Sequence, residues 1–371
     1  MIPFAKPCIG DNEINAVVDT MKSGWLTMGP KTFQFEKDLA EYVGANYVTA
    51  VGSCTAALHL ALLAYKIGKN DEVITSPYTF ASTGNVIHHV GAKPVFVDIN
   101  IDTFNIDTDA ILEAITPKTQ AIIAVDFAGQ PCNYKEINEI ADDHGLVVIA
   151  DAAHSFGAVY QGHPVGTLAD VTCFSFYATK CITMGEGGAV VTGHKRIADH
   201  AAKLRLHGIS KDAWKRYGGG SWRYDIEECG WKYNTTDINA AIGIEQLKKD
   251  QAFQMIRSSI AALYRSNLKN GNIGFQKILG ERTTSNHLFP ILVKGRRDKV
   301  IEQLTEKGIG TSVHFIPLHL HEFYQDTYGY HADMFPNATW VYNHEISLPI
   351  YPGMTESEVM QVIEAVQEVM E

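Results

Sequence analysis

The 371-residue sequence lacks any long hydrophobic run. A membrane-spanning helix needs about 20 consecutive apolar residues, and residues 1–6 lack the basic-then-apolar layout of a secretion signal. Basic residues are also scarce, because 31 lysines and arginines stand against 42 aspartates and glutamates, for a net charge of -11. Nucleic acids and anionic membranes require a concentrated basic face, so neither is expected as the main partner. We therefore expect a cytoplasmic protein that binds any anionic ligand at a local site.

The six cysteines contain no C-x-x-C pair, which argues against a disulfide framework or a thiolate zinc site. The histidine pairs His88-His89 and His319-x-His321 have no carboxylate or cysteine at ligand spacing, so no metal is expected. Internal repeats and low-complexity tracts are missing as well, which excludes solenoids and linker-dominated architectures. A globular protein with 46% hydrophobic and 20% charged residues remains.

Short apolar, β-branched runs alternate with helical patterns through the first half of the chain. The runs lie at 47–51, 72–75, 94–98, 119–125, 146–150, 171–176 and 188–192. Helical patterns lie at 55–65, 83–89, 107–115 and 134–144. Strands that are apolar on both faces belong in a sheet covered by helices on each side, and the alternation implies parallel crossovers. The fold class is α/β, with a three-layer large domain whose ligand site lies at the carboxyl ends of the strands.

The chain is too long for one hydrophobic core, so a second, smaller domain is expected. A helical stretch at 250–268 leads into it, strands are expected at 287–293 and 311–314, and helices at 298–307 and 355–370. We place the large domain with its N-terminal arm at residues 1–248 and a smaller α+β domain at 249–371. In the arm, Ile14, Val17, Val18 and Met21 have helical spacing over 11–21. The glycine-rich segment at 216–224 is typical of a mobile loop.

Three strand ends carry residues that suit chemistry. Residues 51–57 pass from a strand through small side chains into a helix, which offers free amides for an anion, although a simple tight turn fits equally well. Asp151 ends a buried apolar run, where it either meets a cationic partner or caps the next element. Lys180 follows the run at 171–176 and precedes a glycine turn, a place where a surface lysine is also common. Ser175 lies on the same segment.

These three features are the ones that hold pyridoxal 5'-phosphate (PLP) when they surround one pocket: an anion site at a helix start, a buried aspartate and a lysine. The lysine forms a Schiff base with the aldehyde, the aspartate keeps the pyridine nitrogen protonated, and the helix start binds the phosphate. The combination is far more specific than any of its parts.

Six segments make the chain resemble, over essentially its whole length, the DegT/DnrJ/EryC1 family of sugar aminotransferases. They are S-G-W-L-T-M-G-P (23–30), V-G-S-C-T-A-A-L-H (51–59), D-E-V-I-T-S-P-Y-T-F-A-S-T (71–83), I-A-D-A-A-H-S (149–155), F-S-F-Y-A-T-K with E-G-G-A-V-V-T (174–192) and K-Y-N-T-T-D-I-N-A-A-I-G (232–243). The resemblance implies the aspartate-aminotransferase (type I) PLP fold. It is strongest to enzymes that aminate the 4-keto position of nucleotide sugars, such as the UDP-4-amino-4-deoxy-L-arabinose enzymes.

The resemblance also implies roles for residues at the cofactor. Lys180 bonds covalently to PLP, and Asp151 pairs with its pyridine nitrogen. The cofactor phosphate is bound by Thr55, the backbone amide of Ala56 and Ser175. Related 3-dehydrases have histidine in place of Lys180, so the protein is not expected to be a 3-dehydrase.

Other positions follow from the same resemblance. Phe80 stacks on the cofactor ring, and His154 approaches the ring hydroxyl. Asn234 reaches the phosphate of the other subunit, which makes an obligatory homodimer with a shared active site. His314 lies on the substrate side, with Trp25 and Met28 as further substrate-binding candidates.

The implied activity is transamination of a nucleotide-linked 4-keto sugar, with L-glutamate as donor, for lipopolysaccharide or other cell-surface polysaccharide biosynthesis. The Y-N-T-T-D-I-N segment differs from the Y-N-x-R-x-D-E pattern of 3-aminotransferases and favours the 4-position over the 3-position. Two alternatives remain: a regulatory protein that kept the fold and lost the chemistry, and a small-molecule amino-acid aminotransferase. The intact lysine, aspartate and phosphate-loop residues argue against the former. The latter normally needs an arginine for the substrate carboxylate, and none is evident.

Overall fold

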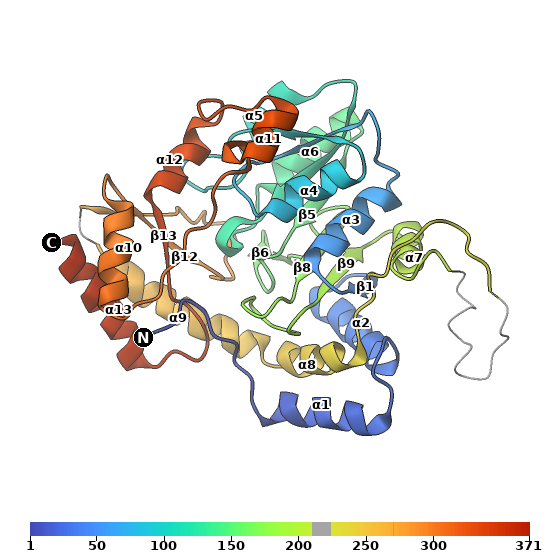
Figure 1. Cartoon of the computed structure of the whole chain (residues 1–371), viewed down its shortest axis with the longest axis horizontal. Coiled ribbons are helices and arrows are strands. Elements are labelled where there is room, and N and C mark those ends of the chain that lie inside the picture. The colour runs from blue at the N-terminus through green and yellow to red at the C-terminus, as the bar shows by residue number, and fades with distance from the viewer. Residues whose placement is uncertain (210–223, 270) are drawn as a thin grey trace.

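A seven-stranded sheet forms the centre of the part of the chain that the computed structural model describes, residues 1–209, 224–269 and 271–371. Its strand order is β1-β9-β8-β5-β4-β2-β3, and Figure 1 labels β1, β9, β8 and β5 of this sheet. The strands are β1 (Tyr47–Val51), β2 (Glu72–Thr75), β3 (Lys93–Phe96), β4 (Thr119–Val125), β5 (Val147–Asp151), β8 (Val171–Ser175) and β9 (Gly188–Thr192). Only β9 runs against the others, because it pairs antiparallel with both β1 and β8 while the remaining pairs are parallel. This confirms a mostly parallel α/β sheet.

Helices cover both faces of this sheet and make a three-layer structure. One face packs against α3 (Cys54–Ala64), α4 (Ala81–His89) and α7 (Lys195–Leu204). The other packs against α2 (Pro30–Val43) with α8 (Asp237–Leu247), and against α5 (Thr108–Ala114) with α6 (Tyr134–His144). Neighbouring residues of β4 show the alternation, since Ile123 packs on the first face and Ile122 on the second. A sheet buried on both sides explains the continuous apolar runs.

The C-terminal part has a smaller antiparallel sheet in the order β10-β12-β13, formed by Ile273–Phe275, Phe289–Val293 and Glu345–Leu348. It packs with α9 (Asp250–Asn267), α10 (Arg297–Glu306) and α13 (Glu356–Met370) around a core of its own. Two short helices, α11 (Glu322–Tyr328) and α12 (Pro336–His344), lie over the large part instead (Figure 1). The N-terminal arm joins the smaller core through a bridge between Ile2 and Ile309. Each helix of the described residues is too short or too polar to cross a membrane.

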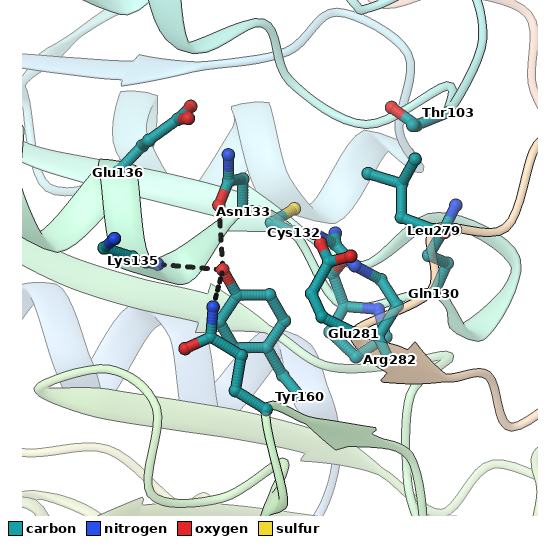
Figure 2. Close-up of polar contacts among 12 residues, drawn as sticks. Thr103, Gln130, Cys132, Asn133, Lys135, Glu136, Tyr160, Leu279, Glu281 and Arg282 are labelled. Carbon is teal, nitrogen blue, oxygen red and sulfur yellow. Dashed lines mark hydrogen bonds and ion pairs between the residues drawn. The ribbon is translucent and has the colours of Figure 1, made fainter.

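The predicted division at 248/249 falls between α8 and α9 and stays a prediction. The C-terminal segment also returns to the large part of the chain, because β11 (Arg282–Thr283) pairs with β6 (Val159–Tyr160), which pairs in turn with β7 (His163–Pro164) in a separate three-stranded sheet. At this junction the Arg282 guanidinium lies 4.8 Å from the centre of the Tyr160 ring, whose hydroxyl bonds Asn133 (Figure 2). Arg282 also donates to the Pro131 carbonyl, so a buried cation ties the two parts together.

The structure corrects some of the expected elements. The strand expected at 311–314 is wrong, because only Ser312 forms a β-bridge, to Ser347. The His314 N–H donates to the Glu345 side chain instead of a neighbouring strand, which ends the pairing there. Helices α2, α11 and α12 and strand β13 were not predicted. The segment expected to be mobile lies, apart from Tyr224, outside the described residues.

Candidate active site

The carboxyl ends of the central strands open into a cavity of about 460 Å³. This is the edge at which parallel α/β sheets bind their ligands, and the volume suits a small molecule. The predicted residues that line it are Thr55, Phe80, Asp151, His154, Ser175, Lys180 and His314. Side chains more than two hundred residues apart in the sequence therefore meet at one place.

Asp151 ends β5 and is only 4% exposed. Its carboxylate accepts hydrogen bonds from Thr83 Oγ1 at 2.7 Å and from the Ala153 N–H at 3.3 Å. Burial raises its pKa, and the Thr83 bond, the Ala153 bond and the Lys180 charge only partly oppose that rise. A buried carboxyl held in this way is suited to a cationic partner inside the cavity.

Lys180 lies at the end of the tight turn that follows β8, where its N–H donates to the Tyr177 carbonyl at 2.9 Å. Lys180 is one of the residues that line the cavity. Burial lowers its pKa, and the nearby Cys54 and Asp151 oppose the change. A lysine with a lowered pKa has a larger neutral fraction, and the neutral amine is the nucleophilic form.

The first turn of α3 forms the third side of the cavity. Ser53 caps the helix by accepting the Ala56 N–H at 3.1 Å, so that amide already has a partner. Thr55 is exposed toward the cavity. A side chain at Gly188 would meet the Ser53 carbonyl carbon at 2.4 Å, so only glycine lets β9 pass this close to the helix start. The approach brings the end of β8, with Ser175, beside the first turn of α3.

Aromatic and imidazole rings fill the remaining wall. His154 stacks on Phe315, with ring centroids 5.8 Å apart, and lies 4.6 Å from the ring of His287. The Nδ1 atoms of both histidines are buried without a partner among the described residues. Burial and the Lys180 charge lower both pKa values well below the usual range. Phe80 is 62% exposed at the mouth, 6.0 Å from the Phe315 ring, so its ring is free to cover a ligand.

Four predicted residues do not line this cavity, namely Ala56, Trp25, Met28 and Asn234. Ala56 is buried one position after Thr55, in the first turn of α3. The Trp25 indole donates to the Met28 carbonyl at 3.2 Å, and Met28 is buried. The two residues therefore form a packed corner between α1 (Asp11–Ser23) and α2. Asp237 holds this corner by accepting the Gly29 N–H at 2.7 Å. Asn234 forms an isolated β-bridge with Val51, the last residue of β1, and its side-chain oxygen accepts a hydrogen bond from Lys232 Nζ. Its predicted role in a partner subunit stays a prediction.

Some cavity residues were missed from the sequence. Those that line the cavity are Phe4, Glu186, His287 and Phe315. Behind the lining lie Thr83, which bonds Asp151, and the buried pair Glu345 and Ser347 next to His314. Thr83 had a visible signal, since it closes the D-E-V-I-T-S-P-Y-T-F-A-S-T segment. Glu186 had one as well, since it opens the E-G-G-A-V-V-T segment. The remaining residues come from the arm and the C-terminal part, and their positions depend on packing between distant segments.

The cavity fits pyridoxal 5'-phosphate. A buried carboxylate suits the pyridine nitrogen, a lysine of lowered pKa suits the aldehyde, and an exposed helix start suits the phosphate. The unpartnered Nδ1 of His154 offers a further polar contact. With the mostly parallel sheet, this arrangement defines a PLP-dependent enzyme of the type I fold.

Comparisons with known proteins agree with this class. The DegT/DnrJ/EryC1/StrS aminotransferase family matches residues 7–367. SpsC, a spore coat polysaccharide biosynthesis protein of Bacillus subtilis, is 45% identical over 100% of this chain and 97% of its own. An uncharacterized protein of Methanocaldococcus jannaschii is 54% identical over 100% of this chain and 97% of its own.

Solved structures point the same way. A Streptococcus pneumoniae protein, provisionally named a sugar aminotransferase, superimposes in its PMP form with a TM-score of 0.95 and 35% identity, covering 100% of this chain and 99% of its own. The same protein is solved in a PLP form. The chain belongs to the DegT/DnrJ/EryC1/StrS aminotransferase family. It is a PLP-dependent aminotransferase, and the family and structures that it matches are those of sugar aminotransferases.

Proposed function

We propose that the protein transfers an amino group from L-glutamate to the 4-keto position of a nucleotide-linked sugar, for cell-surface polysaccharide or glycan biosynthesis. The observation that carries the proposal is the convergence of Lys180, Asp151 and the start of α3 on one cavity in a chain of this family. The name of the SpsC relative supports a polysaccharide pathway. The Y-N-T-T-D-I-N segment supports the 4-position over the 3-position.

The proposed residue roles follow the geometry of the cavity. When bound, PLP supplies an aldehyde that accepts the amino group and a ring that withdraws electrons. Lys180 Nζ would hold the aldehyde covalently and, as a neutral amine, would accept and return a proton. Asp151 would keep a positive charge on the ring nitrogen, and Phe80 and His154 would hold the ring. The phosphate is assigned to Thr55, Ser175 and the Ala56 amide, which would exchange its bond to Ser53 for the phosphate.

A substrate panel tests the reaction. The purified enzyme, loaded with PLP and given glutamate, should aminate 4-keto-6-deoxy sugars or a 4-ketopentose carried on UDP, dTDP or GDP. Formation of the amino sugar and of 2-oxoglutarate measures turnover. Matched 3-keto sugars and plain 2-oxo acids serve as controls and should react at least about 100-fold more slowly, a difference of roughly 2.7 kcal/mol in transition-state binding. Preference for a 3-keto sugar or a 2-oxo acid would contradict the proposal.

The proposal includes a homodimer that shares the active site. In α1 (Asp11–Ser23), the stripe formed by Ile14, Val18 and Met21 faces outward and is 53%, 37% and 58% exposed, whereas Glu13 is buried against α8. These three apolar residues therefore do not face the core of their own chain. An exposed apolar stripe of this kind is typical of a protein interface, and a second copy is the proposed partner.

A Met21→Glu variant tests the interface. Burying an unpaired carboxylate against a partner is costly, so we expect the dimer dissociation constant to rise by about tenfold or more. Analytical ultracentrifugation over a concentration series measures it. Met334→Glu, the same change at a 49% exposed methionine between α11 and α12, is the control and should leave the dimer intact. Equal dissociation constants for both variants and the wild type would place the interface elsewhere.

A further inference from the structure

A short chain of hydrogen bonds joins a buried carboxyl group to the cavity. His314 lines the cavity, and its Nδ1 lies 2.9 Å from Ser347 Oγ. The same hydroxyl bonds Glu345 Oε1. The other oxygen of the carboxyl group, Oε2, accepts the backbone N–H of His314 at 2.8 Å. Glu345 therefore holds the backbone of His314 directly and its ring through Ser347.

Strand β13 explains how this chain of bonds is built. Glu345 and Ser347 are two residues apart on the strand, so their side chains lie on the same face, and both are completely buried. One edge of β13 pairs with β12. On the other edge, Ser347 exchanges backbone hydrogen bonds with Ser312 at 2.8 and 3.2 Å, which brings the His314 segment alongside. The Tyr78 hydroxyl fixes the same segment by donating to the His314 carbonyl.

The His314 ring is neutral at ordinary pH. Burial and the positive charge of Lys180 lower its pKa to about 3. A neutral imidazole carries one hydrogen, and the partner of one nitrogen decides whether the other donates or accepts. Among the described residues Nε2 has no hydrogen-bond partner, so it is the nitrogen left for a ligand in the cavity.

We propose that Glu345 and Ser347 are positioning residues for His314, and that the proton on Glu345 decides which ring nitrogen carries the hydrogen. The inference rests on the proposed function, since it takes the cavity as the active site. It assigns to two buried residues the control of how His314 meets a substrate.

The two states differ by one proton. With Glu345 protonated, Oε1–H donates to Ser347, the Ser347 hydroxyl donates to Nδ1, and Nε2 carries the hydrogen and donates into the cavity. With Glu345 ionised, Ser347 donates to Oε1 and accepts from Nδ1–H, so Nε2 becomes an acceptor. The change releases the carboxyl proton to solvent, and the ring hydrogen moves from Nε2 to Nδ1 by exchange with solvent.

The surroundings place the change near neutral pH. Burial raises the pKa of Glu345 to about 8, while its bonds to Ser347 and the His314 N–H and the positive charge of Arg297 oppose the rise. Tyr78, Lys180, His154 and His287 are the other titratable groups that act on Glu345 or His314. Burial keeps the pKa of Tyr78 well above its usual range and the pKa values of His154 and His287 well below theirs. Below about pH 8, Nε2 should donate, which suits a sugar hydroxyl, a carboxylate or a phosphate oxygen.

Nitrogen NMR of the PLP-loaded enzyme, labelled at histidine, tests the proposal directly. The His314 resonances should show hydrogen on Nε2 at pH 6.5 and on Nδ1 at pH 9.5, with a midpoint near the pKa of Glu345. Glu345→Gln should remove the transition and keep the hydrogen on Nε2 throughout. The glutamine oxygen would accept the His314 N–H, and its amide group would donate to Ser347 as the carboxylic acid does.

Ser347 variants provide the second test. Ser347→Ala should mix the two ring forms, abolish the transition and lower kcat/KM for the keto sugar about tenfold, because Nδ1 loses its buried partner. Ser347→Thr keeps the hydroxyl and should keep the transition. Thr192→Val, which removes a buried hydroxyl from β9 that bonds Asp170, controls for stability and should leave the His314 resonances unchanged.

A pH-independent ring form in the wild type, or an unchanged transition in Glu345→Gln and Ser347→Ala, would overturn the inference. The proposed function is tested separately, by the substrate panel. If the ring transition occurs as described but the substrate panel shows no amination of nucleotide sugars, the positioning stands and the assigned reaction is wrong.

Discussion

Replacing Lys180 with alanine should reduce transamination by at least about 10³-fold, because covalent attachment and proton transfer both depend on this amine. The visible absorbance of the bound cofactor should also shift away from the band of the lysine-bound form. Single-turnover reaction with glutamate, followed by absorbance, measures both effects. Turnover within a few-fold of wild type would contradict the assigned role of Lys180.

The stability of the variant separates chemistry from folding. Lys180 has a lowered pKa, so its burial as an ammonium ion costs free energy in the protein without cofactor. Removal of the side chain should therefore leave the thermal midpoint of that form unchanged or slightly higher. Lys195→Ala is a matched control on α7, where an exposed lysine pairs with Asp199, and should leave both rate and absorbance unchanged. A large fall in the midpoint of Lys180→Ala would make its loss of activity uninformative.

The central sheet could be predicted from the sequence because its strands are buried on both faces. The run at 146–150, for example, is apolar on both faces, which distinguishes it from an amphipathic helix or a polar loop. Asp151 and Lys180 stand out for the same reason, since each interrupts an apolar run or follows its end. Parallel strands with common direction bring those ends to one edge, and topology alone therefore placed them together.

Other features could not be predicted because they depend on contacts between distant segments. His287 looks like an ordinary strand residue in the sequence, and Glu345 lies in a strand that was not predicted. Both reach the cavity region only when the C-terminal part packs against the large part of the chain. In α1, helical spacing of Ile14, Val18 and Met21 predicted the helix correctly but said nothing of what it faces, and the structure leaves the stripe exposed. The missed helix α2 had a visible signal, with Pro30 at its start and Phe35, Leu39 and Val43 at helical spacing.

Replacing Asp151 with asparagine should slow the half-reaction with glutamate by about 10² to 10³-fold, or roughly 2.7–4 kcal/mol, because the variant cannot offer a negative charge to the pyridine nitrogen. The pH profile gives a second readout. Burial raises the pKa of Asp151, so the useful ionised form is favoured as the pH rises. The wild-type rate should therefore fall on the acid side as this carboxyl becomes protonated, and the asparagine variant should lack that fall.

Stability should move in the opposite direction from the rate. Because folding raises the pKa of Asp151, ionising this carboxyl at a pH above its unfolded pKa lowers the free energy of unfolding of the protein without cofactor. Asparagine removes that cost, so the cofactor-free variant should be at least as stable as wild type at pH 7 while reacting far more slowly. A simple helix cap would behave differently, since asparagine caps a helix about as well as aspartate, so the change to asparagine would leave the rate near wild type.

Asp126 offers the matched control for Asp151. It is also fully buried, its pKa is raised to about 6, and it accepts bonds from Ser155 and Tyr134 without lining the cavity. Asp126→Asn should disturb that network and lower the thermal midpoint while the rate per folded enzyme stays within a few-fold of wild type. If Asp151→Asn instead resembles Asp126→Asn, with a near-normal half-reaction and reduced stability, its carboxylate is structural and the cofactor's ring nitrogen has another partner.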